Sequence, residues 1–161
     1  MRRVSYNEIP AGAKVWIYQS DRIINADEKE RIKTALSGFL NNWDSHQSPL
    51  KCYGDIWYDI FIVIMVDEEI NQASGCSIDK SVHFINDIEK EIGLSLMDRM
   101  VFAFKEKDKI KLVSRETFQR SIEEGNINDN TIVFNNLVTN KAEFETKWEV
   151  PLKESWHKQL Y

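Results

Sequence analysis

The segment that most constrains the fold is the run Ile60-Phe61-Ile62-Val63-Ile64-Met65-Val66, in which every residue is apolar. A short run without polar alternation predicts a strand that is covered on both faces. It is far shorter than the roughly 20 residues that cross a bilayer. We therefore expect the central strand of a soluble domain rather than a membrane span.

Elements of both kinds precede this run. Lys14 to Gln19 is rich in β-forming residues and predicts a strand. Asn25 with Glu28 three residues later is a capping-box pattern, and the apolar residues that follow recur at helical spacing. The sequence therefore predicts a helix over residues 26–43 that buries one face.

The apolar run belongs to a longer stretch, residues 49–66, that is either a hairpin or one long strand. Breaks are expected at Gly54-Asp55 or at Tyr58-Asp59, and we favour two strands. A second amphipathic helix follows, with Ser77 as its expected N-cap and Gly93 at its end.

The remaining elements complete the predicted topology. Strands are expected at Met100 to Phe104 and Ile110 to Val113, followed by a helix near Arg115 to Glu124, a strand at Thr131 to Phe134 and a helical tail. The order strand, helix, two strands, helix, strand predicts an α+β fold with a ferredoxin-like split βαβ core, in which two helices cover one face of an antiparallel sheet. The C-terminal part would extend this core, so we expect a single globular domain over residues 1–161.

Charge and cysteine content limit the function classes. The chain of 161 residues has a formal net charge of −5, which argues against nucleic-acid binding because that role needs a basic face. The start has no apolar export segment after Arg2-Arg3. Cys52 and Cys76 match no zinc or disulfide pattern, so a reducing cytoplasm is the expected compartment, with no metal and no cofactor.

The segment Ser74 to Ser81 is the first candidate for chemistry. It opens a helix after an apolar strand, and Lys80-Ser81 match the end of a phosphate-loop motif. Ser74 and Asp79 stand where that motif requires glycines. Glycines allow the backbone to close around phosphate, whereas a carboxylate repels it, so the segment does not predict a nucleotide site.

Cys76 is the candidate nucleophile of this segment. A thiol at the start of a helix lies at the positive end of the helix dipole, which favours the thiolate. Ser77 and Asp79 would orient the reacting groups, but none of His46, His83 and His157 stands beside Cys76 in the sequence. The alternative is a buried structural cysteine, the commoner role of a free thiol.

Further polar residues are candidates for ligand binding. Asp67 follows the apolar strand, Asn135 follows the strand at Thr131 to Phe134, and His157 lies beside a tryptophan. Asp67, Glu68 and Asp79 lack the spacing of a calcium loop, so we assign no metal. The predicted ligand-binding residues are Ser74, Gly75, Ser77, Asp79, Asp67, Asn135 and His157.

Several stretches resemble a small uncharacterised family typical of the Bacteroidetes. They are Val15 to Gln19, Ala73 to Asp79, Thr131 to Leu137, and Trp148 to Pro151 with Ser155-Trp156-His157. Members commonly carry the label "ABC transporter ATPase", which the motifs of this chain do not support. The resemblance covers nearly the whole chain and implies no activity or site residue.

Three functions follow as hypotheses. The first is a non-catalytic cytoplasmic module that binds a small ligand or a protein partner, which includes a homodimer formed through the sheet. Exposure of Trp16, Trp57, Trp148 or Trp156 would favour this function. The second is a small thiol-dependent enzyme centred on Cys76. The third is an ATPase, as the family label suggests.

Overall fold

The computed structural model describes residues 3–69 and 71–161, and the chain divides into two compact units. Unit 1 comprises residues 1–97 with 139–141, and unit 2 comprises residues 98–138 with 142–161. The fold is mixed, with α-helices and antiparallel sheets, so the α+β prediction is confirmed. The expectation of one domain over the whole chain stays a prediction, and each unit is described by itself.

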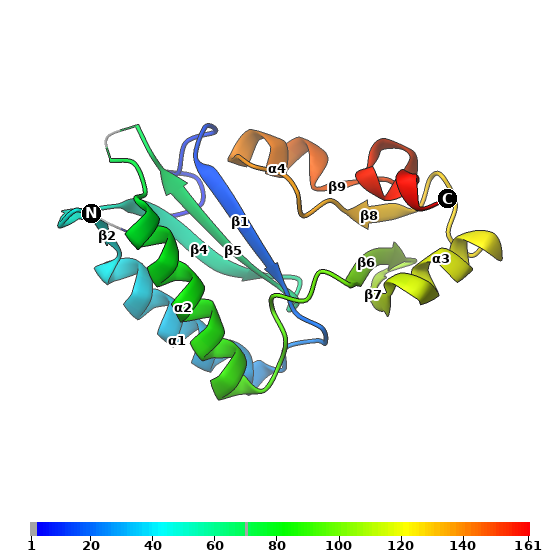
Figure 1. The fold of residues 1–161 in the computed structure, drawn as a ribbon, viewed down its shortest axis with the longest axis horizontal. Coiled ribbons are helices and arrows are strands. Elements are labelled where there is room, and N and C mark those ends of the chain that lie inside the picture. The colour runs from blue at the N-terminus through cyan, green and yellow to red at the C-terminus, as the bar shows by residue number, and fades with distance from the viewer. Residues whose placement is uncertain (1–2, 70) are drawn as a thin grey trace. The chain divides into compact units, whose positions relative to one another are not determined.

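Unit 1 is a three-stranded antiparallel sheet with two helices on one face (Figure 1). Its strands are β1 (Lys14–Gln19), β4 (Lys51–Trp57) and β5 (Phe61–Asp67), and their order is β1-β5-β4. Its helices are α1 (Ala26–Asn42) and α2 (Gly75–Ile92), and the short strands β2 (Asp44–Ser45) and β3 (Ser48–Pro49) form a hairpin after α1. Every residue of β5 is buried, as expected of a central strand.

Local signals set the limits of these elements. The Asn25 side chain accepts a hydrogen bond from the Glu28 amide (2.9 Å) and the Glu28 carboxylate accepts one from the Asn25 amide (3.0 Å), which confirms the capping box. Gly93 adopts the left-handed conformation at the end of α2 (φ 76°), as a C-terminal cap requires. The turn at Tyr58-Asp59 separates β4 from β5, so the prediction of two strands is confirmed.

The core of unit 1 lies between the helices and one face of the sheet. Ile32, Leu36 and Leu40 of α1 pack there against Ile62 and other residues of β5. Gly54 of β4 faces α1 so closely that a Cβ atom at this position would lie 2.8 Å from Leu40 Cδ1. A glycine therefore lets α1 approach the sheet at this point.

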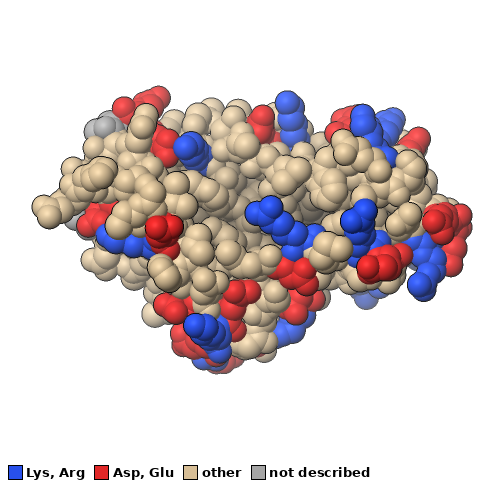
Figure 2. Space-filling view, in the orientation of Figure 1, with Lys and Arg blue, Asp and Glu red and all other residues tan. Residues whose placement is uncertain are grey.

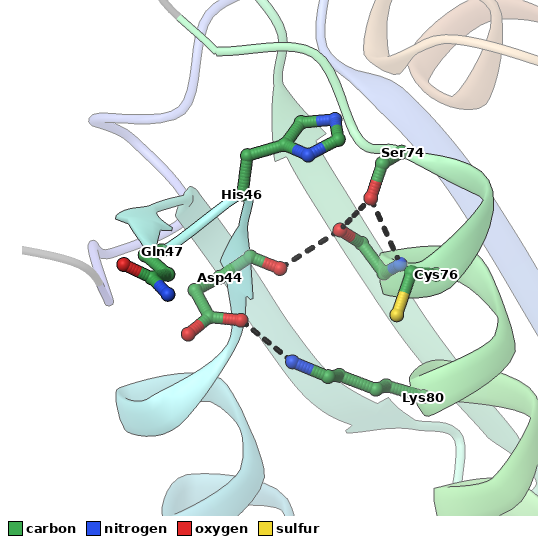
Figure 3. Close-up of a pocket in the computed structure, with 7 residues that line it drawn as sticks. Asp44, His46, Gln47, Ser74, Cys76 and Lys80 are labelled. Atoms are coloured by element: carbon green, nitrogen blue, oxygen red, sulfur yellow. Dashed lines mark hydrogen bonds and ion pairs between the residues drawn. The ribbon is translucent and has the colours of Figure 1, made fainter.

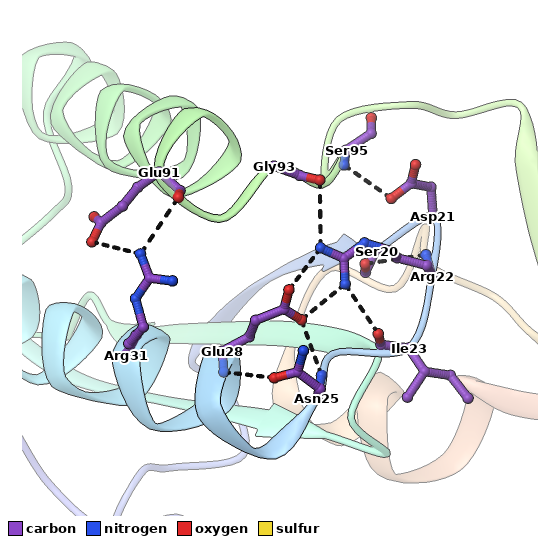
Figure 4. A network of polar contacts seen from close by, with 10 residues as sticks. All are labelled: Ser20, Asp21, Arg22, Ile23, Asn25, Glu28, Arg31, Glu91, Gly93 and Ser95. Atoms are coloured by element: carbon purple, nitrogen blue, oxygen red, sulfur yellow. Dashed lines mark hydrogen bonds and ion pairs between the residues drawn. The ribbon is translucent and has the colours of Figure 1, made fainter.

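Polar side chains tie a loop of unit 1 to both helices (Figure 4). Arg22 donates two hydrogen bonds of 2.8 Å to the Glu28 carboxylate and a longer one of 3.4 Å to the Gly93 carbonyl. The Arg22 guanidinium, followed by the Asn25 amide, lowers the pKa of Glu28 to about 2. Arg31 of α1 likewise contacts Glu91 of α2.

Unit 2 contains a four-stranded antiparallel sheet in the order β7-β6-β8-β9. The strands are β6 (Val101–Glu106), β7 (Lys109–Ser114), β8 (Ile132–Phe134) and β9 (Glu149–Pro151). The helices are α3 (Arg115–Glu123) and α4 (Lys141–Lys147), whose first residue belongs to unit 1, followed by the short 3₁₀ helices η1 (Leu152–Glu154) and η2 (Trp156–Leu160). Phe102, Phe104 and Phe118 lie in its core.

The ferredoxin-like prediction placed β6 in the same sheet as β1. The structure instead pairs β6 with β7 and β8, so it does not confirm that arrangement. Beside β1, the Val15 amide donates to the Thr139 carbonyl (3.0 Å) and the Lys141 amide donates to the Ala13 carbonyl (2.9 Å). A short segment from late in the chain therefore pairs with the start of β1.

Candidate functional site

A pocket of about 240 Å³ lies in unit 1 between the β2–β3 hairpin and the first turns of α2 (Figure 3). Residues of polar or ionisable type line both of its walls. Its lining residues are Asp44, His46, Gln47, Ser74, Cys76, Ser77 and Lys80. Three of the predicted site residues, Ser74, Cys76 and Ser77, are therefore brought together here.

The hairpin wall contains an unusual turn. His46 and Gln47 connect β2 to β3, and both adopt left-handed conformations, with φ of 49° and 65°. A two-residue hairpin turn with positive φ at both positions is usually made by Asn-Gly or Gly-Gly, because side chains with a Cβ atom are strained there. Backbone strain of this kind often accompanies a functional site.

The helix wall begins at Ser74 rather than at Ser77, which corrects the predicted N-cap. The Ser74 hydroxyl accepts a hydrogen bond from the Ser77 amide (3.1 Å). Ser77 is thus inside the first turn, and its own hydroxyl donates to the Asp44 carbonyl of the hairpin (2.8 Å). The two serines stand three residues apart, and the structure uses Ser74 as the cap.

Further contacts fasten the hairpin to α2. Lys80 Nζ donates to Asp44 Oδ1 (2.7 Å), and Trp43 Nε1 donates to the Ser77 carbonyl (2.9 Å). The hydrogen bond to Asp44 raises the pKa of Lys80 and keeps its ammonium charged. Side chains of α2 thus bind the hairpin at Asp44, and the Trp43 side chain, just before the hairpin, binds the backbone of α2 at Ser77.

Cys76 is exposed, whereas Cys52 is completely buried with its thiol 3.5 Å from the Leu40 carbonyl. The expectation of a buried structural cysteine is therefore wrong for Cys76. In Figure 3 the sulfur of Cys76 lies on the Lys80 side of the pocket, and the imidazole of His46 lies on the Ser74 side. The two walls bring a thiol and a histidine into one pocket without joining them by a hydrogen bond.

The other candidates in unit 1 do not line this pocket. Gly75 and Asp79 are exposed on the first turns of α2. Asp67 is buried at the end of β5, where its carboxylate lies 3.5 Å from Lys51 Nζ and accepts a hydrogen bond from the Glu69 amide (3.1 Å). These contacts give Asp67 a structural role, because they link the end of β5 to Lys51 of β4 and to the turn that follows.

Asn135 and His157 both belong to unit 2. The Asn135 side chain accepts a hydrogen bond from the Leu137 amide (3.2 Å), which makes a turn after β8. His157 is only 2% exposed, and its Nδ1 lies 2.7 Å from Ser155 Oγ. The contacts of both residues are thus internal to unit 2.

Metal coordination has no support among residues 3–69 and 71–161, where no three His, Cys, Asp or Glu side chains gather closely enough to hold an ion. The pocket residues that are missing from the predicted set are Lys80 and those of the hairpin, Asp44, His46 and Gln47. A His-Gln pair carries no turn signal, so the sequence does not reveal this wall.

Charges of both signs are mixed on the face of unit 1 that carries α1 and α2 (Figure 2). No helix in the described ranges is long and apolar enough to span a membrane. No protein-family model, characterised protein or solved structure matches the chain.

Proposed function

We propose that the chain is a non-catalytic binding module whose ligand site is the pocket between the β2–β3 hairpin and α2. Support comes from an unused donor on the helix wall: the amide of Cys76, which lines the pocket, finds no acceptor elsewhere in the described chain. Lys80 adds a cationic donor to the same wall. Such a wall suits a small ligand that presents an oxygen acceptor, such as a carboxylate, a phosphate or an amide carbonyl.

The same geometry favours binding over catalysis. Asp44 and Lys80 form an ion pair, and the Ser74 and Ser77 hydroxyls bond to each other (2.8 Å). Activation of a thiol requires a base within hydrogen-bonding reach, and none of the contacts in the described chain supplies one for Cys76. The pocket's polar groups thus hold its walls in place.

Titration of ¹⁵N-labelled protein with acetate, phosphate and acetamide tests this proposal. We expect amide shifts confined to residues 44–48 and 74–80, with a preference for the anions. Lys80→Met should weaken binding about tenfold, the effect of one lost charged hydrogen bond. Lys90→Met, an exposed lysine at the other end of α2, is the matched control and should bind normally. Equal binding by both variants, or shifts that avoid the pocket at saturation, would overturn the assignment.

A thiol-dependent enzyme is the second candidate. Exposure of Cys76 in a pocket that also contains His46 favours it. Alkylation of Cys76 over a range of pH separates the two functions, because an activated thiol reacts at pH values where an ordinary thiol is protonated. A rate that follows the titration of free cysteine, near pH 8.5, would exclude the enzyme.

An ATPase has the least support. Ser81, which matches the end of the phosphate-loop motif, is buried, and its hydroxyl lies 2.6 Å from the Ile78 carbonyl. A phosphate loop needs that hydroxyl free to contact a nucleotide-bound magnesium ion. Mg-ATP should therefore leave the melting temperature unchanged.

The wider expectations remain part of the proposal. The order β1-β5-β4 with α1 and α2 on one face suits a split βαβ core without its fourth strand, which supports a ferredoxin-like relationship for unit 1. Trp16, Trp57 and Trp156 are half-buried and Trp148 is buried, so the exposed tryptophans that would favour a protein interface are missing. We therefore place a small ligand ahead of a homodimer, in a cytoplasmic protein of the resembled family.

A further inference from the structure

The last residues of unit 2 are attached mainly through side chains. We call residues 156–161 the C-terminal strap. Within the ranges that the structure covers, no backbone hydrogen bond joins the strap to a strand or an α-helix. The Lys158 amide donates instead to the carbonyl of Ser155, the residue that precedes the strap (3.2 Å). The Tyr161 hydroxyl donates to Asp129 Oδ1 (2.7 Å). Burial of Trp156, His157 and Leu160 supplies the other attachment.

His157 is the buried centre of this attachment. Its ring stacks on Trp156 at 4.0 Å between centroids and lies 5.3 Å from Phe102 and 5.6 Å from Phe118. Among the described residues, its one polar contact is with the Ser155 hydroxyl. The imidazole thus lies among aromatic rings that suit its neutral form.

No carboxylate compensates a positive charge at this position. The elements in contact with the ring are β6, α3 and η2, η1 packs against η2, and His157 forms no ion pair with any described residue. The charged residues of these elements are Lys105, Glu106, Arg115, Glu116, Arg120, Glu123, Lys153, Glu154 and Lys158. Burial alone lowers the pKa of His157 to about 4.

Trp156 further weakens the attachment. Its indole Nε1 is buried and has no hydrogen-bond partner among the described residues. A buried donor without an acceptor loses the hydrogen bond that water would provide. Burial of this ring therefore stabilises the attached strap less than its apolar contacts alone would. Opening of the strap restores that hydrogen bond.

We propose that the C-terminal strap is a pH-sensitive closure over the aromatic core of unit 2, which protonation of His157 opens. Opening returns the imidazolium to water, breaks few hydrogen bonds and uncovers Phe102 and Phe118. The proton is taken from solvent, and no bond of the chain is made or cut. This device lies wholly in unit 2 and does not depend on the ligand site of unit 1.

The size of the effect follows from the two pKa values. A solvated histidine titrates near 6.5 and buried His157 near 4, so the open form gains protons first as the pH falls. Lowering the pH from 7.5 to 5 should raise the ratio of open to closed strap about 30-fold.

Hydrogen exchange of the full chain between pH 7.5 and pH 5, corrected for intrinsic exchange rates, tests the proposal. Protection of residues 156–161 should fall about 30-fold, while protection of β6 and β8 stays constant. His157→Phe keeps a ring without a titrating group and should abolish the pH dependence. Tyr161→Phe removes the hydrogen bond to Asp129, so it should raise exchange of the strap at every pH and leave the 30-fold ratio unchanged. This variant therefore still tests the proposal if His157→Phe fails to fold. A strap whose protection is independent of pH, or one that opens only together with β6 and β8, would refute the closure.

Discussion

Replacement of Gly54 by alanine should destabilise unit 1, whereas the same replacement at Gly38 should stabilise it. Gly54 lies on β4 under α1, and Gly38 lies on the exposed side of α1. The two substitutions change the chain by the same methyl group. Their opposite signs therefore isolate the contact between helix and sheet from the general effect of losing a glycine.

The loss at Gly54 follows from its surroundings. A Cβ atom there would lie 2.8 Å from Leu40 Cδ1 and 3.4 Å from both Leu36 methyl groups. Leu36 and Leu40 are both buried, so neither can swing into solvent. Overpacking of this kind costs about 1–3 kcal/mol, and the lower entropy of an unfolded alanine returns about 0.4–1 kcal/mol. We expect a net loss of roughly 1–2 kcal/mol.

Gly38 is the control because no heavy atom lies within 4 Å of the added Cβ. An alanine inside a helix is favoured over glycine by about 1 kcal/mol. Gly38→Ala should therefore raise the melting temperature by about 2–4 °C, and Gly54→Ala should lower it by a similar or larger amount. Urea unfolding followed by circular dichroism gives the corresponding free energies.

Leu40→Ala sharpens this test. It removes the methyl group that the new Cβ would meet, so Gly54→Ala should be neutral or stabilising in that background. The coupling between the two sites should reach about 1 kcal/mol or more. A Gly54→Ala protein as stable as the wild type, or additive effects in the double variant, would show that α1 does not depend on the glycine.

Three further predictions concern single side chains. Cys76 should react with a thiol reagent in the native protein and Cys52 only after unfolding, and a count of modified thiols that gives two or none would contradict the structure. Glu28 has a pKa of about 2, below its ordinary 4.5, so its contribution to stability is complete above pH 4.5 and is lost as the pH falls towards 2. Glu28→Gln should therefore destabilise the protein at pH 7. Urea unfolding should also show that the stability of this variant depends less on pH between 4.5 and 2. Ser74→Ala should cost about 1 kcal/mol and increase exchange of the Ser77 amide, whereas Ser74→Asp should preserve the cap.

The sequence predicts the strands β1, β4 and β5 and the helices α1 and α2 of unit 1 because their signals are local. Helical spacing, the Asn25 cap and Gly93 defined both helices, and the apolar run defined β5. Pairing between distant strands has no such signal. The sequence order of β6 suits a fourth strand beside β1, but its residues pair with β7 across a two-residue turn, which closes a much shorter loop.

The candidate site was predicted on one wall only, for the same reason. A helix start is visible in sequence, and Cys76 stands out in it, but the opposite wall depends on a turn that His46 and Gln47 do not favour. Each left-handed residue costs about 1–2 kcal/mol, so the turn needs compensation from outside the hairpin. Ser77 and Lys80 supply it through their hydrogen bonds to Asp44. The shape of the pocket is thus a property of both segments together, and neither segment alone encodes it.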